Sequence, residues 1–188
     1  MATEIKLTRG QVAIVDDIDA DLAELKWCAI TTTTRFYAWR RVTTKPKSKF
    51  EYLHRVIAAR ILGNAIPEGM VIDHIDGNSL NCVRSNLRVC THQQNIQNKA
   101  QSKVNTSGLK GASWSSANKG WRAQIQIDGR VKNLGSFPTI EEAHKAYCIA
   151  ALTYQAPYHN FGSNSPFTGW TLADFEKPII QLTLPIAA

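Results

Sequence analysis

The stretch of residues 70–98 constrains this chain more than any other, because it predicts several elements in a fixed order. Residues 70–72 are an apolar run that indicates a strand. Asp76-Gly77 follows and is a strong signal for a tight turn. Polar residues that favour turns then continue to Asn86. We therefore expect a strand that leads into a long polar loop.

A second strand and a helix are predicted after this loop. Leu87 and Val89 alternate with a polar residue, which indicates a returning strand. Thr91 with Gln94 three residues later is a capping box, so a helix should begin there. In a strand, loop, strand and helix of this kind, three polar side chains can converge, namely Asp73, His74 and Asn95.

This stretch resembles the HNH endonucleases, specifically the phage and intron homing type whose third motif residue is asparagine. The matching residues are His74 after Asp73, Asn86 twelve positions later and Asn95 nine positions beyond it. The resemblance implies a ββα-metal fold that cleaves nucleic-acid phosphodiester bonds with one divalent ion, Mg²⁺ or Mn²⁺. It also implies that Asn86 is not a metal ligand. Asn86 instead bonds the loop backbone and orients His74, and we group these two as the catalytic residues.

The chemistry of these side chains suits phosphodiester hydrolysis. The reaction needs an attacking water, stabilisation of a highly charged transition state and help for the leaving oxygen. A hard divalent ion supplies the last two and prefers oxygen ligands, which Asp73 and Asn95 offer. His74 points to the other side of the strand and can activate the water as general base. Taken singly, each residue also suits a structural role: a turn residue, an exposed helix position or a buried histidine.

Composition narrows the class of partner. The 188-residue chain is 44% hydrophobic and has a formal net charge of +7, from 22 Lys and Arg against 15 Asp and Glu. This excess favours nucleic acid, although a merely basic protein would show it too. No apolar run approaches the ~18 residues of a membrane span, and the N-terminus lacks the apolar region of a signal peptide. We expect no membrane association and a location in the cytoplasm of a bacterial or phage-infected cell.

The four cysteines, Cys28, Cys82, Cys90 and Cys148, form no C-x-x-C pair. This spacing favours reduced, buried thiols over a zinc site.

The region before the motif is expected to be rich in short strands. Residues 27–34 and 35–43 predict a hairpin of β-branched and aromatic residues, and Asp16 or Asp17 can cap a short helix before it. Residues 45–49 form a basic loop that is either a solvated hairpin tip or a phosphate contact. The candidate DNA contacts here are Arg40, Arg41, Lys45, Lys47 and Lys49.

An amphipathic helix is predicted over residues 53–62, and it ends at Gly63-Asn64. His54-Arg55 at its start recurs in related nucleases. A structural role or a phosphate contact is favoured for this pair over direct catalysis. Residues 99–108 are polar and predict a linker in which Lys99 and Lys103 could touch phosphates.

A second module is predicted after the linker. Residues 111–114, 121–128 and 130–137 indicate three strands, and Asp128-Gly129 makes the second turn a tight hairpin. Thr139 with Glu142 is another capping box, so a helix should follow to residue 155 and cover one face of the sheet.

This module contains several short motifs, namely Lys110-Gly111, residues 121–125, residues 134–137, residues 141–143, Ala146-Tyr147 and Asn160-Phe161. They are similar to the ethylene-response-factor (Apetala-type) DNA-binding domain of plants. In that family the three-stranded sheet lies in the major groove of DNA, where a β-ribbon fits. Several family arginines and one strand tryptophan are absent, and Asn133 stands near the place of the tryptophan. The resemblance therefore implies the fold but not a base preference.

The free face of this sheet is expected to carry the DNA contacts, and the alternative is a solvated polar face. The candidate residues are Ser113, Ser115, Lys119, Arg122, Gln124, Gln126, Arg130 and Lys132. The tail from residue 163 to residue 188 could pack on either module through Trp170, Phe175 and Ile179-Ile180.

These inferences describe an α+β protein with a small N-terminal β-rich region, a ββα-metal module, and a three-stranded antiparallel sheet packed on one helix. We expect a nuclease domain over residues 1–98 with its core at about 70–98, a linker at 99–108, a DNA-binding domain at 109–162 and a tail at 163–188. The expected function is sequence-directed cleavage of double-stranded DNA by a monomer or homodimer. The alternative is a non-catalytic DNA-binding protein on a decayed nuclease scaffold.

Overall fold

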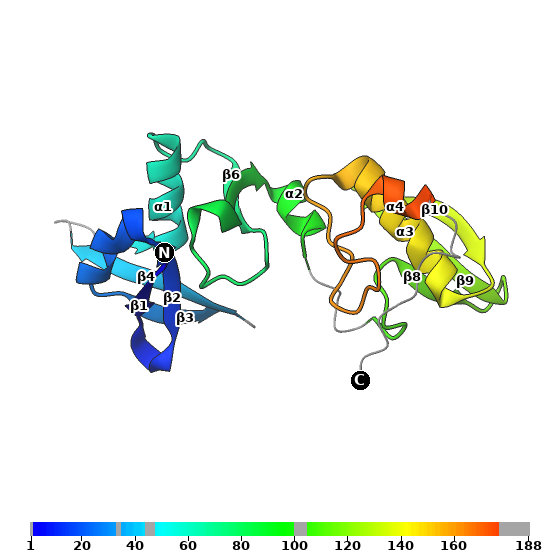
Figure 1. The fold of residues 1–188 in the computed structure, drawn as a ribbon, viewed down its shortest axis with the longest axis horizontal. Coiled ribbons are helices and arrows are strands. Elements are labelled where there is room, and N and C mark those ends of the chain that lie inside the picture. The colour runs from blue at the N-terminus through cyan, green and yellow to red at the C-terminus, as the bar shows by residue number, and fades with distance from the viewer. Residues whose placement is uncertain (1, 33–34, 44–47, 100–104, 177–188) are drawn as a thin grey trace. The chain divides into compact units, whose positions relative to one another are not determined.

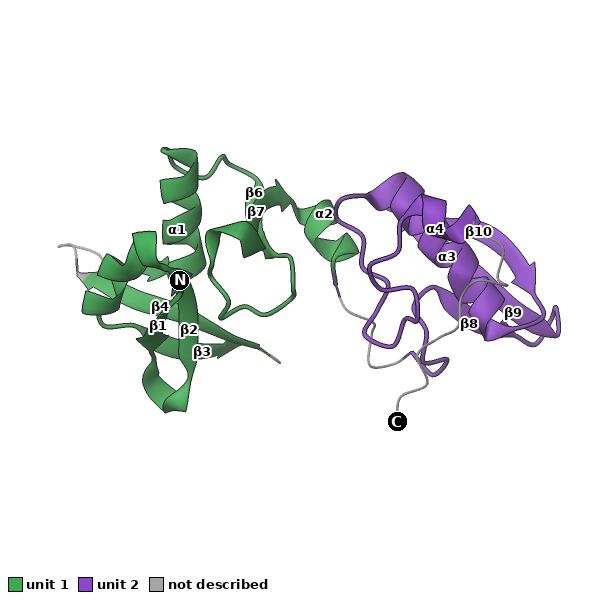
Figure 2. Ribbon diagram, viewed as in Figure 1, with its two compact units in different colours: residues 1–98 green, residues 99–188 purple. Residues whose placement is uncertain are grey.

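The computed structural model describes residues 2–32, 35–43, 48–99 and 105–176, and the chain forms two compact units (Figure 1, Figure 2). Unit 1 is residues 1–98 and unit 2 is residues 99–188. Each unit combines antiparallel strands with helices, which confirms the expected α+β class. Among the helices of the described residues, none is long and apolar enough to cross a membrane.

Unit 1 is built from small antiparallel sheets. Its strands are β1 (Ala2–Lys6), β2 (Val12–Asp16), β3 (Cys28–Thr32), β4 (Arg35–Thr43), β5 (Ser48–Tyr52), β6 (Met70–His74) and β7 (Leu87–Thr91). The sheets are the pair β1–β2, the triplet β3–β4–β5 and the pair β6–β7. The helices are α1 (Leu53–Leu62) and α2 (His92–Gln97), with short 3-10 helices η1 (Thr8–Gly10), η2 (Asp17–Glu24) and η3 (Arg84–Asn86).

Most predicted elements of unit 1 are confirmed. The expected hairpin is β3–β4, and the expected strand, loop, strand and helix are β6, β7 and α2 with the loop between the strands. The capping box of Thr91 and Gln94 is formed. Helix α1 ends at Gly63, whose φ of 66° lies in the left-handed region that glycine adopts without strain.

The predicted cap of the short helix was wrong. Asp16 stands at the N-cap position of η2, but its side chain makes no capping hydrogen bond, and Asp17 is already inside the helix. The Asp16 Oδ2 atom instead accepts a hydrogen bond of 2.6 Å from the backbone N–H of Arg84. The Asp16 carboxylate therefore forms a tertiary hydrogen bond in place of the helix cap that the local sequence predicted.

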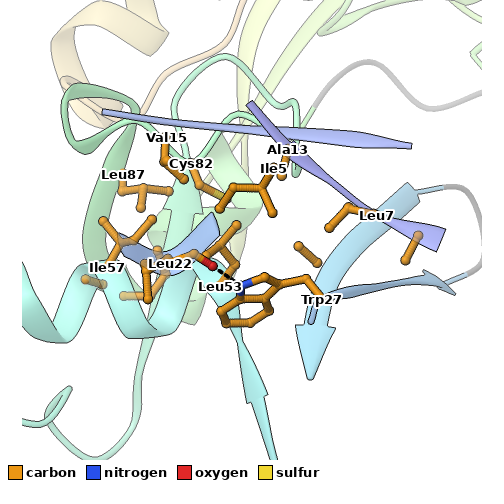
Figure 3. Close-up of a cluster of buried hydrophobic side chains, with 14 residues drawn as sticks. Ile5, Leu7, Ala13, Val15, Leu22, Trp27, Leu53, Ile57, Cys82 and Leu87 are labelled. Carbon is orange, nitrogen blue, oxygen red and sulfur yellow. Dashed lines mark hydrogen bonds between the residues drawn. The ribbon is translucent and has the colours of Figure 1, made fainter. Parts of the chain in front are cut away.

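One hydrophobic core joins the N-terminal strands to the segment that carries the motif (Figure 3). Ile5 of β1 and Val15 of β2 pack with Leu53 and Ile57 of α1 and with Leu87 of β7. The first four of these side chains are at most 1% exposed. The β-rich region is therefore a structural part of the same unit as the motif.

The loop between β6 and β7 is also held by N-terminal strands. The backbone N–H of Ile14 in β2 donates to the carbonyl of Leu80 at 2.9 Å, and the N–H of Cys82 donates to the carbonyl of Ile14 at 2.8 Å. The Ser79 hydroxyl donates to the carbonyl of Phe36 in β4 at 2.5 Å. These bonds supply the long polar loop with the backbone partners that it cannot find within itself.

Unit 2 is one antiparallel sheet covered by a helix. Its strands are β8 (Ala112–Ser115), β9 (Gly120–Ile127) and β10 (Arg130–Phe137), in the order β10–β9–β8. Helix α3 (Ile140–Gln155) packs on all three strands and begins with the predicted capping box of Thr139 and Glu142. Helix α4 (Leu172–Glu176) follows. The predicted three strands and one long helix are therefore confirmed.

A glycine lets α3 approach the start of β8. Gly111 has a φ of 78°, and a Cβ atom built there would lie 2.1 Å from ring atoms of Tyr147. Tyr147 is 4% exposed, so its ring has little room to move away. Any larger residue at position 111 would have to displace it.

The tail packs on unit 2 as far as it is described. The rings of Phe167 and Trp170 lie 4.8 Å apart, and those of Trp170 and Phe175 lie 4.9 Å apart, in the core that α3 covers. Ser165 lies 2.7 Å from Nε2 of the fully buried His144. The prediction for residues 179 and 180 falls outside the described residues.

A buried carboxylate ties the N-terminal region to the motif. Asp19 of η2 is fully buried, and its Oδ2 atom accepts a hydrogen bond of 2.7 Å from Nε of Arg84. Its Oδ1 atom accepts bonds of 3.0 Å from Arg84 and 3.1 Å from Arg60 of α1. The bonds from these two guanidinium groups, with Arg84 first, lower the pKa of Asp19 below its usual value of 3.8 against the opposing effect of burial.

We predict that Asp19→Asn lowers the free energy of unfolding at neutral pH by about 2 kcal/mol, because it weakens charge-assisted hydrogen bonds inside the fold. A carboxylate with a lowered folded-state pKa stabilises the fold above its unfolded-state pKa of 3.8 and loses this contribution as pH falls. The difference between wild type and variant should therefore narrow in acid. Urea unfolding measured at neutral pH and just below the ordinary aspartate pKa checks this.

Asp21→Asn is the control, because Asp21 also pairs with Arg60 but is 58% exposed. It should change stability little. A loss in Asp19→Asn that is equally large at both pH values would contradict the prediction.

Candidate functional site

The pairing of β6 with β7 places the motif residues. In this register Asp73 lies opposite Arg88, and His74 lies opposite Leu87. Asp73 is 4% exposed and His74 is 6% exposed, so two polar side chains that end β6 are buried. Successive residues of a strand point to opposite faces, so the two side chains meet different surroundings.

His74 lies in a cluster of aromatic rings. Its ring centre is 5.2 Å from that of His54 in α1 and 6.3 Å from that of Tyr37 in β4. The ring of Tyr52 lies 5.7 Å from His54. Nε2 of His74 and Nδ1 of His54 are both buried, and neither has a hydrogen-bond partner among the described residues. A buried polar atom without a partner is uncommon and suggests a group that meets a ligand.

Burial keeps both histidines neutral. It lowers the pKa of His74 to about 4, although Asp76 and Asp73 act in the opposite direction. It lowers the pKa of His54 to about 3, with a further contribution from His74. Over the physiological pH range each imidazole is therefore unprotonated and can accept a proton.

Asp73 is held by two donors. Arg88 donates from Nε at 2.8 Å and lies 2.7 Å away through Nη2, both to Oδ2 of Asp73. The side-chain amide of Asn98 donates to both carboxylate oxygens at 3.1 Å and to the carbonyl of His74 at 2.9 Å. Asn98 follows α2 directly and is 7% exposed. These contacts fix the orientation of the carboxylate.

The expectation that Asn95 and Asp73 converge on one metal ion stays a prediction. Asn95 is half-buried in α2, and among the described residues no hydrogen bond links its side chain to Asp73. The asparagine that touches Asp73 is Asn98, which the sequence argument missed. The sequence could have suggested Asn98, because it lies three positions after Asn95 and residues with this spacing lie on the same side of a helix.

Asn86 holds the loop, as the resemblance implied. Its Oδ1 atom accepts a hydrogen bond of 3.0 Å from the backbone N–H of Asp76. Its amide donates to Oδ1 of Asp76 at 2.9 Å and to the carbonyl of Asn81 at 2.7 Å. Its backbone carbonyl accepts from the N–H of Ile75 at 2.9 Å. The loop that begins next to His74 is thus closed on one buried side chain.

The donor atoms at this site suit a hard ion with few protein ligands. Among the described residues there is no group of three or more His, Cys, Asp and Glu that could hold a metal ion. Among the described residues the site offers the buried carboxylate of Asp73, the amide of Asn98 beside it and a buried nitrogen of His74 that has no hydrogen-bond partner. Mg²⁺ commonly takes one or two carboxylates and completes its shell with water and substrate phosphate, so the residues present fit such an ion.

The basic candidates of unit 1 differ in availability. Arg40 is paired with Glu51 at 2.8 Å and lies over the ring of Trp27, so its charge is already compensated. Arg41 bonds the Ser48 hydroxyl and is exposed. Lys49 and Arg55 are exposed too, and so is Lys99, the first residue of unit 2. Lys45, Lys47 and Lys103 lie outside the described residues.

The strand register corrects the predicted sheet face in unit 2. Ser113 and Ser136 lie opposite Arg122, and Asn133 lies opposite Gln124, so these residues share the face that α3 does not cover. Residues at alternate positions of β8 and β9 share this face, namely Ser115 and Gln126.

Arg130 and Lys132 were wrongly assigned to that face. They lie opposite Ile127 and Ile125, and Ile125 is buried in the core under α3. Nζ of Lys132 accordingly donates to the hydroxyl of Tyr154 in α3 at 3.0 Å. The pairing of β10 with β9 at the hairpin turn decides which face of the sheet each residue of β10 occupies. The alternation of residues along β10 does not predict this pairing. Lys119 lies in the turn between β8 and β9 with a φ of 47°.

Comparisons with known proteins identify the segment of the chain that carries these residues. Residues 51–97 match the HNH endonuclease family. A stretch of 76 residues is 45% identical to "Protein 3.8" of Escherichia phage T7 and covers 40% of this chain and 63% of that protein. A stretch of 99 residues is 38% identical to the uncharacterized HNH endonuclease L560 of Acanthamoeba polyphaga mimivirus and covers 53% and 50%. The chain thus spans about half to two thirds of the length of these curated relatives. No solved structure matches it.

The chain therefore carries an HNH endonuclease domain at residues 51–97 and has a viral HNH endonuclease as a homologue. The matched segment begins before α1, so it is longer than the core expected at residues 70–98. The structure gives a reason for this extension. Helix α1 supplies Leu53 and Ile57 to the core and brings His54 against His74.

We predict that Asn86→Ala opens the loop locally and lowers the free energy of unfolding by about 2 kcal/mol, because buried polar groups lose their partners. The backbone N–H of Asp76 loses its acceptor, whereas that of Ile75 keeps the backbone carbonyl of residue 86. Hydrogen exchange measured amide by amide should show faster exchange at Asp76 and little change at Ile75. Unchanged protection at Asp76 would refute this role.

Proposed function

We propose that this protein is a divalent-metal-dependent endonuclease that hydrolyses phosphodiester bonds of double-stranded DNA. The observation that carries the proposal is the buried Nε2 of His74. It has no partner in the part of the chain that the structure describes, and His74 follows Asp73 in the segment that matches the HNH family. An imidazole kept neutral by burial is unprotonated, which a general base must be to accept a proton. The net charge of +7 supports an anionic substrate.

Each side chain has a distinct role in this proposal. His74 takes a proton from the water that attacks the phosphate. Asp73 and Asn95 provide oxygen ligands for one Mg²⁺ or Mn²⁺ ion, and Asn98 orients the Asp73 carboxylate through its amide. When bound, the ion supplies charge stabilisation for the phosphate and for the leaving oxygen. Asn86 keeps the loop closed beside His74.

With one such site per chain, a monomer would nick one strand. A double-strand cut would require a homodimer or two successive events. The alternative function, DNA binding on a nuclease scaffold that no longer cleaves, is favoured by one observation: Arg88 and Asn98 already occupy the carboxylate of Asp73. An assay for Mg²⁺-dependent plasmid cleavage separates the two.

We predict that His74→Ala lowers the cleavage rate by about 10²–10⁴-fold and leaves DNA affinity nearly unchanged, because it removes a general base and no major phosphate contact. Plasmid cleavage at saturating Mg²⁺ and binding of the same duplex give the two readouts. His92→Ala is the control, because His92 is an exposed histidine at the start of α2 in the same unit. A cleavage rate of His74→Ala equal to that of the wild type would contradict the assignment of His74 as the general base.

We further infer that the second unit, around residues 109–162, supplies most of the DNA affinity and resembles ethylene-response-factor domains in its use of the sheet. The support is the polar row of Ser113, Arg122, Gln124 and Gln126 on the face that α3 leaves free. Nε of Arg122 is buried and has no hydrogen-bond partner within the described ranges, which suits a guanidinium that binds a ligand.

We predict that a chain ending after Ser107 binds DNA weakly and with little selectivity. Arg122→Ala in the full chain should weaken binding by about 1–3 kcal/mol if Arg122 reads a base edge. It should instead reduce the salt slope by about one if Arg122 touches only phosphate. Lys132→Ala is the matched control, because Lys132 lies on the face of the sheet that α3 covers. This substitution should weaken DNA binding less than Arg122→Ala does.

Binding of one duplex measured against salt concentration decides among these outcomes. Equal affinity and selectivity in the shortened and full chains would exclude unit 2 as the reader. Recognition would then fall to the basic residues of unit 1.

A further inference from the structure

The ion pair between Asp73 and Arg88 is built into the β6–β7 sheet. The two residues are direct cross-strand partners, so their side chains leave the sheet close together. Both nitrogens of the Arg88 contact approach the same oxygen, Oδ2, at 2.8 Å and 2.7 Å. The side chains of Arg88 and Asp73 are only 16% and 5% exposed. Solvent therefore screens this pair less than the exposed ion pairs of the surface.

Arg88 and a divalent cation have conflicting demands on Asp73. Both are positive and both are attracted to the same carboxylate, whose Oδ2 atom Arg88 already holds, whereas Asn98 approaches it with a neutral amide. Two positive charges a few ångströms apart in a partly dry site repel each other. Asp73 is also the carboxylate on which the proposed ion would depend, and the described residues contain no group of three or more His, Cys, Asp and Glu that could hold the ion in its place.

We propose that Arg88 is an internal competitor for the divalent cation: it neutralises Asp73 when no ion is present and must leave Oδ2 for the ion to bind. The inference rests on the proposed metal-dependent function. Arg88 thereby keeps a buried carboxylate paired, which avoids the cost of an isolated buried charge. The same contact lowers the metal affinity of the site. Apparent affinity falls in proportion to the fraction of molecules in which the carboxylate is free.

The test is a titration of Mn²⁺ into the full chain by calorimetry, without DNA and at mildly alkaline pH. Arg88→Gln should bind Mn²⁺ about five- to tenfold more tightly than wild type, which corresponds to Arg88 holding the carboxylate in about 80–90% of molecules. Asp73→Ala should lose this binding. Arg60→Gln is the matched control, because Arg60 also pairs with a buried carboxylate, that of Asp19, and it should bind as wild type does.

A second measurement keeps the test valid if Arg88→Gln is less stable. An ion that binds the folded state raises the melting temperature in proportion to its affinity. The rise caused by Mn²⁺ should be larger in Arg88→Gln than in wild type. Arg88→Lys keeps the charge but cannot present two nitrogens, so its Mn²⁺ affinity should fall between those of wild type and Arg88→Gln.

The outcomes separate this inference from the function on which it rests. If wild type binds Mn²⁺ through Asp73 but Arg88→Gln binds equally or more weakly, Arg88 is not a competitor, and the metal site stands. If Asp73→Ala binds Mn²⁺ as wild type does, or if neither wild type nor Arg88→Gln binds the ion, the proposed metal site fails and this inference fails with it.

Discussion

The antiparallel register of β6 and β7 is the constraint on which the site depends. In this register Asp73 and His74 are the last two residues of β6, and their side chains point to opposite faces of the strand. One face directs the carboxylate to Arg88 and Asn98, and the other directs the imidazole to His54 and Tyr37. A shift by one residue would exchange these surroundings, so the register must be held firmly.

That register is held by parts of the chain far from it in sequence. The loop between the two strands closes on Asn86 and is bonded to β2 and β4 by backbone groups of Ile14 and Phe36. The shared core and the buried Asp19 add packing and charge contacts between the same regions. The N-terminal β-rich region therefore serves as the support that lets a polar loop remain ordered next to buried polar groups.

The two units use antiparallel strands and helices to place their polar side chains in different surroundings. In unit 1 small sheets and α1 are packed around one loop, so the buried polar side chains gather at the end of β6. In unit 2 helix α3 covers one side of the sheet, and Arg122 and Gln124 lie on the side that α3 does not cover. A buried site strengthens the interactions between its polar and charged groups, and an open polar face is accessible to a large partner.

The sequence alone determined what depends on near neighbours along the chain. Capping boxes, the Asp76-Gly77 turn and alternating apolar residues predicted the strands and helices, and the spacing of His74, Asn86 and Asn95 predicted the family. The tertiary structure decided which partner each polar group takes: Asp16 bonds Arg84, Asp73 pairs with Arg88 and Asn98, and Lys132 meets Tyr154. Such pairings join residues that are far apart in sequence, and they follow from strand register and from the burial of groups that cannot stay without partners.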